Sequence, residues 1–140
     1  MSRKMYETPA DLENERRIAL HTEKACNFKL NKMGIKYHLD FMAFRGKEAV
    51  AAVEVKHRNK KSTDWPTTML PLHKYNRGVE FHNFNGLSFL VVFEFDDGIY
   101  CYKYKDGDNF SILFGGRKDR GDVQDLEPFV CIPIERMQKL

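Results

Sequence analysis

The sequence has no apolar run that approaches the ~20 residues of a membrane-spanning helix, and its first residues, MSRKMYETPADLENERR, lack the apolar core of a secretory signal. Neither sign of charge dominates, because 23 lysines and arginines stand against 20 acidic residues, which leaves a net charge of +3. These absences predict a soluble cytoplasmic protein, of the host cell if the chain is viral, that makes no membrane contact. They also exclude binding of nucleic acid through bulk charge, so any such affinity must be local.

Cysteine is scarce as well. The three cysteines, at positions 26, 101 and 131, are odd in number, far apart and without a CxxC or a cysteine–histidine cluster at zinc spacing. This pattern predicts reduced thiols in the core and excludes a zinc site or a disulfide framework.

Repeats, low-complexity tracts and linkers are also missing from the sequence. At 140 residues, 13% of them aromatic, the chain can bury roughly two thirds of its unfolded surface, and we expect one globular domain over residues 1–140.

The first predicted element is a helix over residues 8–31. Thr8 suits the N-cap and Pro9 the first helical position, and Gly34 is expected to end the helix as a left-handed cap. Apolar or small residues at helical spacing predict its buried face: Leu12, Ile18, Ala19, Thr22, Ala25 and Cys26. Glu15 falls on this stripe, whereas Glu13 shares its face with basic residues. The spacing leaves two alternatives for Glu15, an acid of a functional site or a carboxylate at the edge of the stripe that is salt-bridged to a neighbour.

A hairpin is expected next, with strands over residues 35–44 and 49–56 joined by a turn at 45–47. The second strand, AVAAVEVK, consists of alanine and valine apart from Glu54 and Lys56, which share one face because side chains alternate along a strand. A carboxylate and an ammonium group inside an apolar strand are tolerated only when they pair, bind a metal or open into a cleft. Asp40, the odd residue of the first strand, can converge with Glu54 across the ladder. The hairpin therefore predicts two carboxylates beside one lysine.

The remaining elements are predicted from apolar runs and turn signals. Residues 57–66 form a polar, basic loop that carries the single tryptophan, Trp65. Two alternatives stay open for Trp65, an anchor that ties the loop to the core or a surface on which an unpaired base stacks. An irregular helix is expected over residues 67–84. Strands are predicted at 87–95, 99–104, 110–114 and 129–134, with a polar loop at 115–128 and a tail at 135–140.

The predicted order of elements resembles the PD-(D/E)xK superfamily of restriction-endonuclease-like nucleases. It has a helix with an inward glutamate, then a hairpin with an aspartate on one strand and Glu-x-Lys on the next, and then a helix and further strands. Asp40 matches the isolated aspartate, Glu54-Val55-Lys56 the (D/E)xK element, and Glu15 the helical glutamate of many members. The resemblance covers about residues 8–104, and Leu39 stands where the motif often has proline. It implies an α/β fold, a restriction-endonuclease-like core whose central mixed β-sheet is flanked by helices in α-β-β-α-β order.

The resemblance also implies roles for single residues. Asp40, Glu54 and the carbonyl of Val55 would bind Mg²⁺, which Mn²⁺ could replace, because such hard cations prefer oxygen ligands. Glu15 would complete this shell, although Glu13 is the other helical acid that could do so. Lys56 would hold or help deprotonate the attacking water. Contacts with DNA phosphates are expected from five basic side chains, each of which could also be an ordinary solvated one: His57, Arg58, Lys60, Lys61 and Lys74.

Three functions fit these residues. The first is a metal-dependent DNA endonuclease that hydrolyses phosphodiester bonds and selects its substrate by structure or strand rather than by base sequence. The second is a Holliday-junction resolvase of the same fold, for which a homodimer is expected, and the third is a non-catalytic nucleic-acid-binding protein. A purely structural ion-pair network of Asp40, Glu54 and Lys56 is the alternative to all three. The sequence leaves open whether the substrate is single-stranded, duplex or branched, whether it is DNA or RNA, and whether cutting is internal or from an end.

Overall fold

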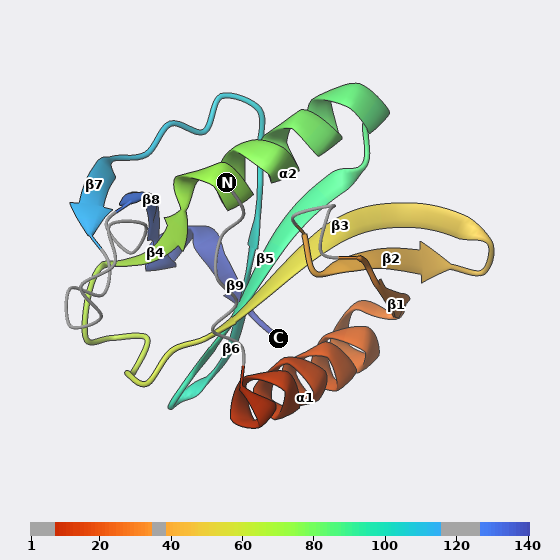
Figure 1. The fold of residues 1–140 in the computed structure, drawn as a ribbon, viewed down its shortest axis with the longest axis horizontal. Coiled ribbons are helices and arrows are strands. Elements are labelled where there is room, and N and C mark those ends of the chain that lie inside the picture. The colour runs from red at the N-terminus through yellow and green to blue at the C-terminus, as the bar shows by residue number, and fades with distance from the viewer. Residues whose placement is uncertain (1–7, 35–38, 116–126) are drawn as a thin grey trace.

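The computed structural model describes residues 8–34, 39–115 and 127–140, and its two helices lie on opposite sides of a central β-sheet (Figure 1). The described elements are, in chain order, α1 (Pro9–Cys26), β1 (Lys29–Lys32), β2 (Phe41–Arg45), β3 (Glu48–His57), β4 (Thr67–Pro71), α2 (Leu72–Asn85), β5 (Ser88–Phe95), β6 (Gly98–Lys103), β7 (Ile112–Gly115), β8 (Glu127–Pro133) and β9 (Met137–Lys139). One turn of 3-10 helix, Ile134–Arg136, precedes β9. Neither described helix combines the length and the hydropathy that crossing a membrane requires.

Six strands form the main sheet, in the order β1-β2-β3-β5-β6-β9. Strands β3 and β5 pair in parallel and all other neighbours pair antiparallel, so the sheet is mixed. The parallel pair lies at the centre, where helices cover both faces, and parallel strands in this position are built from continuous apolar runs. The prediction of a central mixed sheet flanked by helices is confirmed.

Side-chain alternation in β3 divides the core into two layers. Val53 and Val55 point to the face on which α1 packs through Ile18. Ala52 points to the opposite face, where α2 packs through Tyr75. Glu54 and Lys56, which share the face of Ala52, therefore face α2.

Helix α1 begins as predicted but ends earlier. Thr8 and Asp11 form a capping box, in which the Thr8 hydroxyl oxygen accepts a hydrogen bond from the Asp11 N–H at 3.1 Å. The predicted extension to residue 31 with a cap at Gly34 is wrong, because Asn27, in the left-handed conformation at φ 55°, ends the helix. The chain then forms β1, which pairs with β2. Asparagine adopts left-handed backbone with little strain, so an asparagine cap is a weaker sequence signal than the glycine further along.

Two other predictions are also wrong. Residues 67–71, expected to begin a helix, form β4, and α2 begins only at Leu72, because Pro71 disfavours a helical conformation in the residue before it. Residues 137–139, expected in a tail, form β9 at the edge of the main sheet beside β6. Strand β4 belongs to a separate three-stranded antiparallel sheet in the order β4-β8-β7.

The other predicted strands are present with shifted ends. The strand expected over residues 35–44 is seen only from Phe41 onward, and residues 35–38 lie outside the described part of the chain. Most of the loop expected over residues 115–128 also lies outside it. The α-β-β-α-β order corresponds to α1, β2, β3, α2 and β5, with β1 and β4 inserted.

Candidate active site

Glu54 holds a buried carboxylate on the face of the main sheet that α2 covers. It lies near the end of β3 and is 0% exposed, and no other charged residue is buried among those that the structure describes. Moving a carboxylate out of water is costly unless opposite charges or hydrogen bonds compensate it. The surroundings of Glu54 therefore show what this site can do.

Two lysines from different elements supply part of the compensation. Lys56 Nζ, from the same face of β3, lies 3.2 Å from Glu54 Oε2, and Lys74 Nζ, from α2, lies 3.5 Å from the same oxygen. The lysine side chains are 25% and 22% exposed, so both ammonium groups border solvent. Both of these contacts are made to Oε2, and within the described residues Oε1 accepts no hydrogen bond. The carboxylate thus keeps a capacity to bind a ligand that the described protein groups leave unused.

The electrostatics of Glu54 follow from this environment. Burial raises the pKa of Glu54 above its ordinary value of 4.5, the positive charge of Lys56 lowers it, the negative charge of Asp40 raises it, and Lys74 lowers it. The net direction is upward. A further cation beside the carboxylate would favour the ionised form.

Asp40 reaches the same point from the start of β2. The pair Phe41 and Val53 is the last one between β2 and β3, so Asp40 comes opposite Glu54 just beyond the ladder. Asp40 Oδ2 accepts a hydrogen bond from the Val55 N–H at 2.9 Å and so takes the place of a strand partner. Because the N–H and C=O of one residue point to the same side of a strand, the Val55 carbonyl faces the edge where Asp40 lies. Asp40 is also close enough to Glu54 for its negative charge to raise the pKa of Glu54.

Arg58 extends the positive charge along the same face of β3. Its guanidinium lies over the Phe93 ring, 5.6 Å from the ring centroid, and donates to the Met69 carbonyl oxygen of β4 at 2.7 Å. Burial lowers the pKa of Arg58, and the negative charge of Glu54 opposes this shift. Three cations thus lie around one buried carboxylate, and side chains of this kind bind phosphate oxygens through charge-assisted hydrogen bonds.

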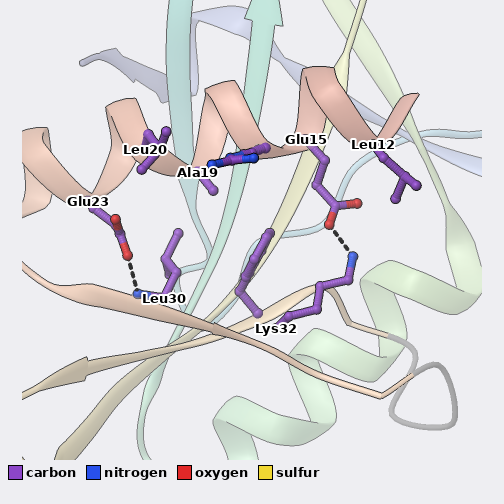
Figure 2. A pocket seen from close by; sticks show the side chains of 9 residues that line it. Leu12, Glu15, Ala19, Leu20, Glu23, Leu30 and Lys32 are labelled. Atoms are coloured by element: carbon purple, nitrogen blue, oxygen red, sulfur yellow. Dashed lines mark hydrogen bonds and ion pairs between the residues drawn. The ribbon is translucent and has the colours of Figure 1, made fainter. Parts of the chain in front are cut away.

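Glu15 lies on α1, which covers the face of the sheet opposite to α2 and to the Glu54 side chain (Figure 1). Its carboxylate is 15% exposed and pairs with Lys32 of β1, across a groove of about 260 Å³ between α1 and β1 (Figure 2). No three acidic, histidine or cysteine side chains of the described residues are grouped to hold a metal ion. The structure therefore does not bring Glu15 together with Asp40 and Glu54. Of the two alternatives for Glu15, its contacts match the salt-bridged carboxylate, and its role in a functional site stays a prediction.

His57 is the basic loop residue that turns away from this cluster. Its Nδ1 lies 2.7 Å from Glu94 Oε1 and its Nε2 lies 2.9 Å from Asn59 Oδ1. Arg17 of α1 pairs with the same Glu94. These contacts hold His57 on the α1 side of the sheet, whereas Lys56 and Arg58 lie on the α2 side.

Lys60 and Lys61 lie on a turn that the β5–β6 hairpin holds in place. The N–H and Oγ of Ser62 both donate to the Asp97 carboxylate, at 2.8 Å and 2.6 Å. The sequence marks Asp97 as a turn residue, but it carries no signal of this distant partner, so the anchoring role of Asp97 could not be predicted. Trp65 follows on the same loop and is 65% exposed. The alternative in which Trp65 anchors the loop to the core is therefore wrong.

Comparison with known proteins bears on the fold and on the family. No curated protein matches the chain. Hjc, a Holliday junction resolvase from the hyperthermophilic archaeon Archaeoglobus fulgidus, has a similar fold, with a TM-score of 0.50 over 64% of this chain and 69% of that chain and with 20% sequence identity. At that identity the likeness concerns the fold alone. The resemblance that the Asp40 and Glu54-Val55-Lys56 motif indicates is confirmed by a match over residues 1–140, and the chain belongs to the family described as "Phage putative PDDEXK endonuclease".

Proposed function

We propose that the protein is a divalent-metal-dependent DNA endonuclease that selects its substrate by structure or strand. The observation that carries this proposal is the buried carboxylate of Glu54, which faces Asp40 and two lysines in a chain of an endonuclease family. A charge that is costly to bury and incompletely compensated is typical of a functional site. A structural ion-pair network would gain stability from hydrogen bonds to both carboxylate oxygens, and among the described residues Glu54 Oε1 accepts none.

The donor atoms at the start of β2 and near the end of β3 fit a hard divalent cation, Mg²⁺ or Mn²⁺. Glu54 and Asp40 offer carboxylate oxygens, Val55 offers a carbonyl oxygen, and sulfur and imidazole ligands are not among them. Magnesium sites commonly use only one or two carboxylates and retain several waters, so two acids suffice. When bound, the cation would neutralise the negative charge that builds on the phosphate during hydrolysis.

The lysines and Arg58 act on the substrate side of this site. Lys56, beside Glu54 and in contact with solvent, would hold the attacking water through its ammonium group and offset the charge of the phosphate. Lys74 and Arg58 would bind the non-bridging oxygens of the scissile phosphate, which their positions near Glu54 support. By resemblance to the family, we expect a 5′-phosphate and a 3′-hydroxyl as products.

The first test is cleavage of labelled single-stranded, duplex, flap and four-way-junction DNA with Mg²⁺, Mn²⁺ or chelator. The four-way junction is included because the solved relative Hjc is a Holliday junction resolvase. We expect metal-dependent internal cleavage, with a preference among these structures that does not depend on base sequence. Cleavage that is unchanged by chelator would contradict the proposal.

Substitutions then test the assigned residues. Glu54→Gln removes the charge at nearly constant volume, and we expect it and Lys56→Ala to reduce the cleavage rate about 100-fold or more. The matched controls are Glu48→Gln, an exposed position of the same strand, and Lys24→Ala, an exposed position of α1, which should cut as the wild type does. Glu15→Ala should reduce the rate less. Full activity of Glu54→Gln would show that the active site lies elsewhere.

A further inference from the structure

Trp65 is the only tryptophan of the chain and is 65% exposed. Most described aromatic side chains lie instead in the hydrophobic core or pack against it, and among the described aromatics only Phe84 and Phe114 are comparably exposed, at 88% and 81%. Scattered exposed aromatics are ordinary on protein surfaces. Trp65 differs from them because hydrogen bonds fix the loop that carries it and because this loop is connected to the proposed active site.

The loop that carries Trp65 is fixed on both sides. Before it, Ser62 donates twice to the Asp97 carboxylate, and Asp64 accepts a hydrogen bond from the backbone of the same turn at 2.8 Å. After it, the carbonyl oxygen of Pro66 accepts a hydrogen bond from the Ile134 N–H at 2.9 Å. An aromatic ring presented on a fixed backbone can bind with little loss of conformational entropy.

The same loop is connected to the proposed active site. Trp65 precedes β4, and the Met69 carbonyl oxygen of β4 accepts a hydrogen bond from Arg58. Arg58 lies close enough to Glu54 for the negative charge of Glu54 to affect its pKa. From Trp65 to Met69 an extended chain spans at most about 14 Å, which is roughly four stacked nucleotides at ~3.4 Å each. A base on Trp65 can therefore belong to the strand whose phosphate lies at the site.

Charge around Trp65 suits a nucleic-acid strand. Lys61 is exposed on the same turn, and Lys60 is half-buried beside Arg58. Burial and the positive charge of Arg58 lower the pKa of Lys60, so these two cations lie near each other. Backbone-tracking cations next to an aromatic platform are typical of sites for single-stranded nucleic acid.

We propose that Trp65 stacks on an unpaired base of the DNA substrate while Lys60 and Lys61 bind the adjacent phosphates, so that the enzyme prefers DNA with single-stranded nucleotides beside the scissile bond. This inference rests on the proposed function and specifies its substrate. In an intact duplex the faces of the bases are covered by their neighbours, so Trp65 gains no stacking partner unless a base is extruded.

Because Trp65 is the only tryptophan, its fluorescence reports the contact directly. The experiment uses the Glu54→Gln protein with chelator, so that DNA is bound without being cut. Titration with single-stranded oligothymidylate should quench the fluorescence saturably, whereas a duplex of equal length should quench it weakly. Unchanged fluorescence at saturating single-stranded DNA would overturn the inference.

Affinity measured by anisotropy of labelled DNA gives the second readout. Trp65→Ala should weaken binding of the single strand about 5- to 150-fold, as expected for one stacked base, and change duplex binding less than about twofold. Trp65→Phe should retain most of the affinity, and Phe84→Ala, which removes an exposed aromatic at the far end of α2, should leave it unchanged. Equal weakening of single-stranded and duplex DNA by Trp65→Ala would overturn the inference.

Cleavage separates this inference from the proposed function. In the otherwise wild-type protein, Trp65→Ala should lose the preference for substrates with unpaired bases and still cut with Mg²⁺. If Trp65→Ala keeps the full preference while Glu54→Gln is inactive, the stacking inference fails and the active site stands. If Glu54→Gln cuts normally while single strands still quench Trp65, the active site fails and the stacking site stands.

Discussion

At the scale of single residues, Glu54 is fully buried, and the lysines at 3.2 Å and 3.5 Å from its Oε2 border solvent. Burial shifts the pKa of Glu54 upward, whereas binding of a cation requires the ionised carboxylate. Burial and metal binding therefore favour opposite protonation states of Glu54. Stability of the protein without metal and its capacity to bind metal should consequently change in opposite directions with pH.

The variant Glu54→Gln tests how burial of this side chain affects the stability of the metal-free protein. Because burial raises the pKa of Glu54 above 4.5, the stabilisation that comes with its protonated form is complete below about pH 4.5 and is lost as pH rises through the raised pKa. Glutamine mimics the protonated acid, so in chelator at pH 8 we expect the variant to melt at a higher temperature than the wild type. The expected gain is about 1.4 kcal/mol for each unit by which the pKa is raised.

Thermal melts from pH 4 to pH 8 measure this effect. The gain in melting temperature should disappear near pH 4, where the wild-type side chain is itself protonated. Glu48→Gln, at an exposed position of the same strand, should show no such pH dependence. A lower melting temperature for Glu54→Gln at pH 8 would mean that the ion pairs with Lys56 and Lys74 outweigh the cost of burial.

The sequence predicts some of these residue positions and not others. Strand alternation is enough to place Glu54 and Lys56 on one face, and the short hairpin is enough to place Asp40 near them. Helical spacing indicates that Glu15 faces the sheet, but it cannot say which side of the sheet the helix covers. That side depends on the packing of the whole chain, which puts α1 and α2 on opposite faces.

At the scale of elements, the position of Lys74 depends on how closely α2 approaches β5. Gly78 of α2 is buried against Phe89 of β5, and a Cβ atom on Gly78 would lie 2.2 Å from the Phe89 ring. This glycine lets the helix pack closely enough for Lys74 to reach Glu54. Substitution of Gly78 should therefore disturb both stability and the active site.

We expect Gly78→Ala to lower the free energy of unfolding by about 1–3 kcal/mol through overpacking, although alanine favours a helix by up to ~1 kcal/mol over glycine. Urea denaturation measures this loss, and Asn76→Ala, at an exposed position of α2, should be nearly neutral. Combination with Phe89→Leu should restore part of the stability because it removes the ring that the new methyl group meets. Equal stability of Gly78→Ala and the wild type would show that α2 can move without cost.

Elements differ in how far the sequence predicts them. The central strands β3 and β5 are predictable because each contains a long, mostly apolar run, and the start of α1 because of its capping residues. The short strands β1, β4 and β9 are missed, since three to five residues give too little periodicity and each strand is defined by its partner. Strand β4 matters for function, because it ties Arg58 to the loop of Trp65.

At the scale of the whole molecule, the proposed cation would bind a site whose residues come from three places in the chain, so its binding is coupled to folding of the whole domain. Asp40 precedes β2, Glu54 and Val55 belong to β3, and Lys74 reaches the same carboxylate from α2. None of these contacts is expected to persist in the unfolded chain. A ligand that binds only the folded state stabilises the whole molecule in proportion to its occupancy.

We therefore expect Mg²⁺ to raise the melting temperature of the wild type relative to chelator at equal ionic strength, by an amount equivalent to about 2.7 kcal/mol when the metal concentration is 100 times its dissociation constant. The increase should grow with pH, because ionisation of Glu54 must precede binding. Asp40→Asn and Glu54→Gln should lose the metal-dependent increase, whereas Glu48→Gln should keep it. Equal increases in all four proteins would indicate that the metal stabilises the fold from some other place, and the buried carboxylate would then need another explanation.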